Sequence, residues 1–458
     1  MASRSLREGV APAYLLLCLL LGGSAQGIWV NAILQLLAVG IIAWAALAPD
    51  QGNTSIWGRR LMVVCAIGLL VILIQLIPMP PAIWGTLPGR QIVTDGYAIL
   101  GLPLPWMAVT LAPDQTLSTV LRLLPPAAIL AAMVGLKAYR PAWMAWALIA
   151  GTCAGVFLGA LQVTGGGNLT SPWYPYPISN FGSAVGFFAN SNHMAMLLVV
   201  TIPFLFALVA TTRREREKKS IQKRSALFAL AGALLLVVLL GLALNRSLAG
   251  FGLGLPALAA SVILLLRPER QGRWLLAPVL VGLIAVGTIF MLPVTASVQS
   301  LGAGASFETR RAVGATSLRA AGDFLPLGSG LGSFPLVYPL YEDPDRVDRT
   351  FVNHAHNDYL EMAIEAGLPG MLWVLLFLVW WFATARVRWR DIIDDPFARA
   401  GTIASAAILA HSLVDFPLRT SAMAAVLAAS VALMAQSFRP NREKTESDIR
   451  PARHLEIR

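Results

Sequence analysis

The sequence predicts an all-α polytopic membrane protein with about 12 transmembrane helices and a long external loop that contains short helices. Of its 458 residues, 57% are hydrophobic and 13% are charged, and its mean hydropathy of +0.67 lies outside the range of ordinary soluble domains. Apolar runs long enough to cross a bilayer core of about 30 Å recur along the chain. Basic residues cluster at the ends of these runs, where they set topology. One membrane domain therefore takes up nearly all of the length.

The predicted spans cover residues 13–21, 28–47, 61–77, 116–136, 143–161, 191–210, 226–244, 248–266, 274–294, 371–385, 402–413 and 422–438. The first run follows Arg4 and Arg7 and resembles a secretory signal peptide, but we favour an uncleaved span. With both termini in the cytoplasm, the basic clusters between spans fall on the cytoplasmic side, as the positive-inside rule requires.

This topology divides the chain into a few segments. Helices 1–9 occupy residues 1–294, the external loop residues 295–368, helices 10–12 residues 369–438, and a cytoplasmic tail residues 439–458. A second external segment, residues 78–114, is rich in proline and glycine, which predicts a loop with short helices only.

Charge and cysteine content exclude several classes of function. The net charge of +11 sits in clusters beside apolar runs, so we interpret it as a topology signal and expect no nucleic-acid partner. Cys18, Cys65 and Cys153 each lie inside an apolar run without a C-x-x-C spacing, which argues against disulfides and a zinc site.

Ionisable chemistry concentrates in the stretch from Val352 to Gly370. A helix from about Asn357 would place Asp358, Glu361 and Glu365 on one face, and Gly367 followed by Pro369 would end it. A simple surface helix that joins the loop to a span is the alternative.

Several cations fall on the external side, opposite to where arginines accumulate: Arg246, Arg310, Arg311, Arg319, His354 and His356. Arg246 stands in an apolar hairpin, where burial at a helix centre costs about 2.5–3.5 kcal/mol and less near an end. Snorkelling to the interface is the alternative for Arg246.

The arginines of the loop have helical spacing over residues 309–322, so Arg311 and Arg319 lie within about 80° of each other. Guanidinium groups bind phosphate oxygens bidentately, which favours a phosphate-bearing lipid headgroup. Neutralisation by Glu308, Asp323 or anionic lipids is the alternative. Histidine adds a proton acceptor near neutral pH.

Other motifs argue against metal and nucleotide chemistry. The glycine-rich residues 325–334 lack the Lys-Ser/Thr of a P-loop and predict a bend where backbone approaches backbone. His354, His356 and Asp358 have no third histidine or cysteine nearby, so we expect no metal site. The signatures of hydrolases and of sugar-nucleotide transferases are missing as well.

Four segments carry a resemblance to a known family. Residues 354–361 (HAHNDYLE), 365–370 (EAGLPG) and 326–334 (PLGSGLGSF) resemble the signature of the O-antigen ligase and O-antigen polymerase family. Residues 186–193 (GFFANSNH) resemble its segment at the head of a span, and Asn245-Arg246-Ser247 resembles its Ser-Arg-Gly hairpin. The resemblance covers roughly residues 186–418. Asn245 and Ser191 depart from the usual family residues without removing a charge.

The resemblance implies a GT-C-like fold in the bacterial inner membrane, with an active site at the periplasmic face and no cofactor. It implies transfer of a glycan from undecaprenyl diphosphate to an acceptor hydroxyl. His356 would be the base, and Arg246 and Arg311 the catalytic arginines, with Arg310 as the rival of Arg311. The residues that we expect to contact substrate are Arg310, Arg319, His354, Asn357, Asp358, Glu361, Asn190 and Asn192.

The expected partners are the carrier-linked glycan, its acceptor and membrane lipids. A ligase uses lipid A-core as acceptor, whereas an O-antigen or exopolysaccharide polymerase uses another carrier-linked glycan. A transporter of lipid-linked glycans without covalent chemistry is a further alternative, although the sequence shows no internal repeat. The external turn from His411 to Arg419 either supports the site or binds the acceptor, or is a simple interfacial turn.

Overall fold

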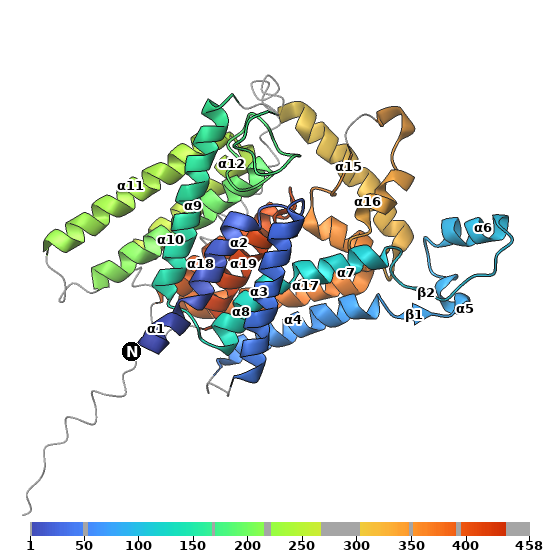
Figure 1. The fold of residues 1–458 in the computed structure, drawn as a ribbon, viewed down its shortest axis with the longest axis horizontal. Helices are drawn as coiled ribbons and strands as arrows, with labels where there is room; N and C mark the ends of the chain where they lie inside the picture. The colour runs from blue at the N-terminus through green and yellow to red at the C-terminus, as the bar shows by residue number, and fades with distance from the viewer. Residues whose placement is uncertain are drawn as a thin grey trace, which may run out of the picture.

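The computed structural model describes residues 2–48, 54–166, 170–214, 221–266, 303–347, 351–390 and 395–436. The described chain is mostly helical, with one antiparallel two-stranded sheet in which Pro78 pairs with Ala108 (Figure 1).

The first part of the chain forms α1 (Ala2–Glu8), α2 (Val10–Leu21), α3 (Ile28–Leu47), α4 (Ile56–Ile74), β1 (Pro78–Met79), α5 (Pro81–Trp84), α6 (Gln91–Ile99), β2 (Met107–Ala108), α7 (Pro113–Arg122), α8 (Leu124–Leu130), the π-helix η1 (Ala131–Gly135) and α9 (Pro141–Thr164). The second part forms α10 (Ser191–Arg214), α11 (Ile221–Asn245), α12 (Leu248–Leu266), α15 (Ala303–Phe324), α16 (Phe334–Val337), the 3-10 helices η3 (Tyr338–Leu340) and η4 (Pro344–Arg346), α17 (Asp358–Arg390), α18 (Pro396–His411), the 3-10 helix η5 (Pro417–Arg419) and α19 (Ser421–Ala435).

Eight stretches of the described chain are long and apolar enough to cross a membrane: Ile28–Leu47, Ile56–Ile74, Pro113–Gly135, Pro141–Thr164, Ser191–Thr212, Ser225–Asn245, Leu248–Leu265 and Asp358–Arg390. Each coincides with a predicted span, so the protein is a multi-pass membrane protein. The spans predicted at residues 13–21, 402–413 and 422–438 fall on α2, α18 and α19, which have 12, 16 and 15 residues. The span predicted at residues 274–294 lies outside the described residues.

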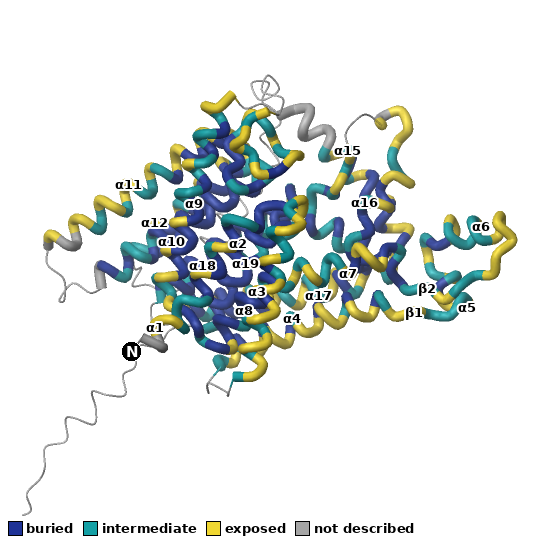
Figure 2. Tube along the Cα trace, viewed as in Figure 1, coloured by how far each residue is buried: buried dark blue, intermediate teal, exposed yellow. Residues whose placement is uncertain are grey.

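The core of the membrane part is built on α10, α18 and α19. Helix α10 packs against α9, α11, α12 and α18, and α19 packs against α2, α8 and α18. Small residues let these backbones approach closely, since a Cβ atom on Gly401 of α18 would lie 2.5 Å from the carbonyl oxygen of Ser430 in α19. Figure 2 shows this central bundle buried, whereas α3 and α11 expose much of their surface, as expected for helices that face lipid.

A second, smaller core joins α15, α16 and η3 to the start of α17. Val313 and Phe324 of α15, Phe334 of α16 and Ile364 of α17 are buried in one cluster, to which Tyr338 of η3 also belongs. The helix predicted over residues 309–322 is therefore confirmed, and it is longer than predicted at both ends. The segment at residues 78–114 was expected to hold only short helices, which α5 and α6 confirm.

The end predicted for the helix after Asn357 is only half correct. Gly367 has φ 56° and ψ −146°, which breaks the helix, and a Cβ atom there would lie 2.2 Å from the carbonyl oxygen of Pro326. The chain nevertheless re-enters a helix at once and continues to Arg390, because Pro369 lies in the first turn of the second half, where a missing N–H is tolerated.

Candidate functional site

The carboxylate of Asp415, in the turn between α18 and α19, is the centre of a cluster drawn from distant parts of the chain. Asp415 is fully buried and accepts a 2.5 Å hydrogen bond from the side-chain amide of Asn192, at the start of α10. Its Oδ1 atom lies 3.7 Å from Nδ1 of His356, in the loop before α17. Arg310 of α15 brings its Nη2 atom to 3.9 Å of Oδ2.

Two further histidines complete the surroundings of this carboxylate. Nε2 of His193 lies 4.0 Å from Oδ1, and Nε2 of His411 lies 3.9 Å from Oδ2. These distances are those of electrostatic contacts rather than of hydrogen bonds. Burial by itself would raise the pKa of the Asp415 carboxyl, but the three imidazoles and the arginine around it hold that pKa well below its usual value. Asp415 is therefore an anion that organises cationic and titratable groups.

The two polar residues that flank Arg246 connect the hairpin between α11 and α12 to this cluster. The side-chain amide of Asn245 donates to the carbonyl oxygens of Ala184 (2.7 Å) and Ser191 (2.9 Å). The hydroxyl of Ser247 donates to Oδ1 of Asn192 at 2.7 Å. Asn245, which departs from the family residue, thus ties the hairpin to the head of α10. Arg246 itself is exposed and forms no ion pair with the described residues.

The loop before α17 that contains His354 and His356, which we call the histidine loop, is packed on the ring of Phe416. The imidazole of His354 lies 4.2 Å from this ring, that of His356 5.1 Å and that of His193 5.2 Å, measured between ring centroids. The phenyl ring therefore fixes where the three imidazoles lie. The side chain of His356 stays 29% exposed, so one edge of it can meet a substrate.

A second buried cluster of charges, around Arg419, contacts the histidine loop through Glu361. Arg419 of η5 contacts Asp358 (3.5 Å), Glu361 (3.2 Å) and Glu365 (3.2 Å), all from the first turns of α17. Burial alone would lower the pKa of Arg419, but the three carboxylates raise it above its ordinary value. Glu361 also bonds Nδ1 of His354 at 2.9 Å.

Three residues that we expected to contact substrate have other partners in the structure. Glu361 and Asp358 are buried against Arg419, and Asp358 additionally accepts a hydrogen bond from Ser412 at 2.8 Å. The side chain of Asn357 accepts hydrogen bonds from the backbone N–H groups of residues 359 and 360 and so caps α17.

Of the other residues predicted to bind substrate or act in catalysis, some lie in the Asp415 cluster and others are exposed at the surface. Asn192 lies in the cluster, and Asn190 accepts a hydrogen bond from the backbone N–H of Asn192 at the head of α10. Arg311 and Arg319 are exposed on α15, where Arg319 donates to Thr316 of its own helix. Of the two neighbouring arginines, Arg310 is the one that the structure brings to the histidines.

Sequence reasoning assigned no role to four residues of these clusters: His193, His411, Asp415 and Arg419. Asp415 and Arg419 lie in the turn from His411 to Arg419, which was singled out because it is polar between two apolar runs. That polarity was the available signal, but it could not show that one residue faces the histidines and the other faces α17.

The glycine-rich loop forms the predicted bend. Gly328 and Gly330 have φ of 82° and 106°, and a Cβ atom at Gly330 would lie 1.9 Å from the hydroxyl of Thr110. Gln75 at the end of α4 fixes the loop, since it donates to the carbonyl oxygen of Glu365 (3.0 Å) and accepts from the N–H of Leu331 (3.1 Å). This loop therefore packs backbone against backbone beside α17.

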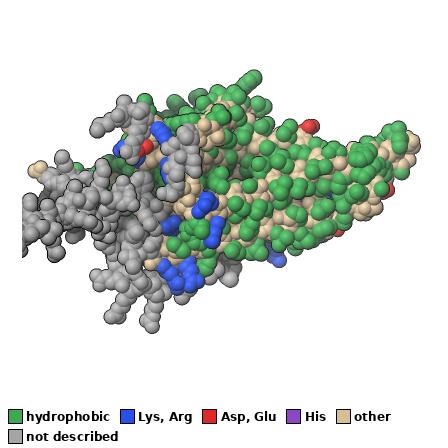
Figure 3. Space-filling view, turned by 90° about the horizontal axis from the view of Figure 1, so that it is seen from below, with side chains coloured by type: hydrophobic (Ala, Val, Ile, Leu, Met, Phe, Trp, Pro, Cys, Tyr) green, Lys and Arg blue, Asp and Glu red, His purple; other side chains and the backbone are tan. Residues whose placement is uncertain are grey.

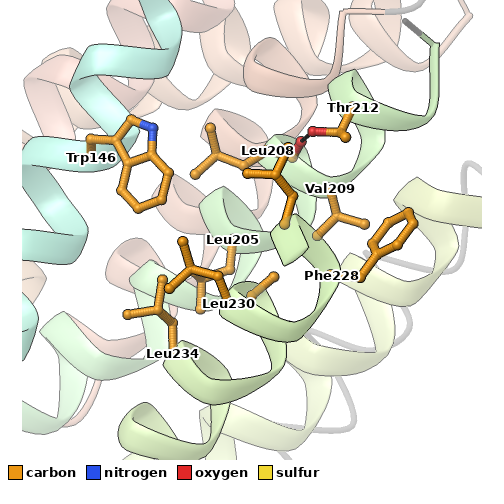
Figure 4. A pocket seen from close by; sticks show the side chains of 10 residues that line it. Trp146, Leu205, Leu208, Val209, Thr212, Phe228, Leu230 and Leu234 are labelled. Carbon is orange, nitrogen blue, oxygen red and sulfur yellow. Dashed lines mark hydrogen bonds between the residues drawn. The ribbon is translucent and has the colours of Figure 1, made fainter. Parts of the chain in front are cut away.

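The described residues form no metal cluster, and the crevice between α9, α10 and α11 is apolar. The described residues contain no group of three or more His, Cys, Asp and Glu side chains arranged to hold a metal ion. An apolar crevice of about 20 Å³ opens between α9, α10 and α11, lined by side chains such as Trp146, Leu208 and Phe228 (Figure 4). It presents no titratable group, in contrast to the Asp415 cluster.

Comparison with known proteins gives a family match that covers part of the chain. The family model described as O-antigen ligase matches residues 233–375, which include the Arg246 hairpin, α15 and the histidine loop. A search of curated proteins gives no match. The matched segment contains the motifs at residues 245–247, 326–334, 354–361 and 365–370, whereas residues 186–193 lie outside it. Residues 233–375 of the chain therefore match the O-antigen ligase family.

Proposed function

We propose that the protein is a membrane glycosyltransferase that moves a glycan from undecaprenyl diphosphate to a hydroxyl group of an acceptor. The family match supports a role as O-antigen ligase or polymerase in lipopolysaccharide assembly. We place the reaction at the periplasmic face of the inner membrane, with both termini in the cytoplasm, and propose about 12 spans in a GT-C-like arrangement. Lipid A-core is the proposed acceptor.

The observation that carries this proposal is the position of His356. Its Nδ1 atom faces the buried carboxylate of Asp415 at 3.7 Å, and its side chain is partly exposed. A carboxylate on one ring nitrogen favours the tautomer that leaves the other nitrogen free to accept a proton. His356 is therefore suited to act as a general base toward a substrate on its exposed edge.

In the proposed reaction the acceptor hydroxyl oxygen attacks the anomeric carbon while its proton passes to Nε2 of His356. The bond between the anomeric carbon and the phosphate oxygen breaks, and undecaprenyl diphosphate leaves with the electron pair. Direct displacement inverts the anomeric carbon. Asp415 stabilises the imidazolium that forms, because a buried anion offsets the new positive charge.

The diphosphate would be held by arginines on the same side of the molecule. Arg246 projects from a hairpin that Asn245 and Ser247 fix, and Arg310 lies at the edge of the Asp415 cluster. Guanidinium groups stay charged and bind phosphate oxygens bidentately, so they stabilise the charge of the leaving group without a metal. Arg311 and Arg319 are exposed on the same helix and extend this cationic surface.

A polymerase differs from a ligase only in its acceptor. The two are separated by reconstituting the full-length protein with undecaprenyl-diphosphate-linked repeat units alone, then with lipid A-core, and following products on a gel. Transfer that requires lipid A-core supports the ligase, and a ladder of longer carrier-linked chains supports the polymerase. Movement of the carrier across the bilayer without any new glycosidic bond would refute both and favour a transporter.

His356→Ala is expected to abolish transfer, by at least about a hundredfold, because general-base catalysis contributes about 10²–10⁴-fold. Binding of the carrier-linked glycan should persist, since the arginines remain. Asn353→Ala, an exposed position in the same loop, is the matched control and should transfer normally. Normal rates with His356→Ala would remove this histidine as the base.

A further inference from the structure

Residues 78–109, which we call the apolar lobe, project from the body of the protein beside the external elements. The lobe contains β1, α5, α6 and β2 and lies at the right of Figure 1, beyond the end of α4. None of the residues in the proposed transfer reaction belongs to it.

The surface of the apolar lobe is unlike that of a loop in water. Six large apolar side chains are between 51% and 85% exposed: Ile83, Ile92, Ile99, Leu100, Leu102 and Trp106. The lobe contains two charged residues, Arg90 and Asp95, and Arg90 is 1% exposed. Asp95 is thus the one charge that the lobe presents. Contiguous exposed apolar surface of this kind marks a site of contact with a membrane or a partner.

Continuity with the lipid-facing surface of α4 identifies the partner. Strand β1 begins four residues after the end of α4, and Leu70, Leu73, Ile74 and Ile77 along this path are 44–56% exposed. Figure 3 shows hydrophobic side chains over this face from the middle of the molecule to the end where the lobe lies, whereas Lys and Arg gather toward the other half. The apolar surface therefore runs from the membrane span onto the lobe.

The root of the lobe is joined to the glycine-rich loop by Arg90. Buried Arg90 donates to the carbonyl oxygens of Val109 and Gly328 and lies 5.7 Å from the ring of Phe324. Burial lowers the pKa of Arg90 to about 10, so it remains a cation at neutral pH. Trp84 closes the lobe by donating to the carbonyl oxygen of Pro105 at 2.7 Å.

We propose that the apolar lobe docks into the lipid leaflet on the side of the membrane where the candidate site opens. Trp106 and the apolar tip of α6 enter the interfacial region, where aromatic side chains are favoured, and Asp95 stays in water. Because Arg90 joins the root to Gly328, the docked lobe holds the glycine-rich loop and α17 at a fixed height above the bilayer. The lobe thus serves as a membrane-surface anchor for the site.

The test places an environment-sensitive NBD probe on the lobe of the full-length protein in nanodiscs of phosphatidylethanolamine and phosphatidylglycerol. Cys18, Cys65 and Cys153 are replaced by alanine, and a single cysteine is introduced by Leu100→Cys. Asp345→Cys, an exposed polar position in η4, is the matched control. Lipids that carry a nitroxide on the acyl chain should quench the probe at position 100 at least twofold more strongly than at position 345.

Two outcomes would overturn the proposal. One is emission and iodide quenching at position 100 that equal those at position 345, which would place the lobe in water. The other is a shielded probe that lipid nitroxides do not quench, which would indicate a protein partner or a second copy of the chain. If the cysteine-free background does not fold, brominated lipids can be used to compare the wild-type protein with Trp106→Phe. Docking predicts that the substitution removes part of the bromine-quenched fluorescence, and no difference contradicts it.

Discussion

Two residues at the candidate site stand out by their backbone as well as by their chemistry. Arg246 and His356 have φ of 59° and 53°, a left-handed conformation that costs non-glycine residues about 1–3 kcal/mol. Lys137 is the other non-glycine residue with positive φ in the described chain. Such strain persists where the surroundings fix it, and here hydrogen bonds of Asn245 and Ser247 and the packing of Phe416 do so. Strain at both proposed catalytic residues agrees with their roles.

Arg310 and Arg311 provide a matched pair for testing the arginine assignment. Arg310→Gln should lower kcat/KM by about 10–100-fold, because a charge-assisted hydrogen bond contributes about 1.5–3 kcal/mol. Arg311→Gln should have the smaller effect, since Arg311 is exposed and Arg310 lies 3.9 Å from Asp415. Initial rates of transfer with both variants decide the question. A larger loss with Arg311→Gln would restore Arg311 as the loop arginine.

At the scale of elements, the first turns of α17 and the turn after α18 act as one unit. The carboxylates at positions 358, 361 and 365 share one face, as the helical pattern predicted, and they converge on Arg419. Through Glu361 the same cluster reaches Nδ1 of His354 and the N–H of Ala355. The cluster therefore connects helix packing to the loop that carries His356.

Arg419→Met should destabilise the protein by about 3–5 kcal/mol, because it leaves three carboxylates buried without their cation. The pKa of Arg419 is raised in the folded state, so its contribution is fully present below the unfolded pKa and is lost only as the pH rises through the folded value. Thermal unfolding in detergent at pH 7 is the measurement. Arg59→Met, at an exposed position of α4, is the control, and equal melting temperatures for the two variants would refute the role of the cluster.

The glycine-rich loop allows a contrast between two glycines. Gly330→Ala should cost about 2–4 kcal/mol, because its φ is 106° and the new Cβ would overlap Thr110. Gly322→Ala should be neutral or stabilising by up to about 1 kcal/mol, since it lies inside α15 with open space around it. Melting temperatures of the two variants test this, and a tolerated Gly330→Ala would mean that the loop can move away.

At the scale of the whole molecule, the described chain has eight candidate spans, and the candidate site is assembled where segments from residues 190, 246, 310, 356 and 415 meet. If the candidate site faces the periplasm, cysteines on the two sides of the membrane should differ in their labelling. In intact spheroplasts, a membrane-impermeant maleimide should label a cysteine at Asp345 but label one at Arg390 only after lysis. The reverse pattern would invert the proposed orientation.

The sequence by itself determined the membrane class and the positions of the eight candidate spans of the described chain, because apolar length and basic flanks follow from composition along the chain. It also singled out His356, Arg246 and the carboxylate face of α17, because these are local patterns of residue type. Only the tertiary structure decided that Asp415 lies beside His356 and that Arg419 contacts the carboxylates of α17. It also decided that Arg310 rather than Arg311 approaches the histidines, and that Asn357 is a helix cap. These pairings join residues that lie tens to hundreds of positions apart, and helix packing sets such distances rather than any local pattern.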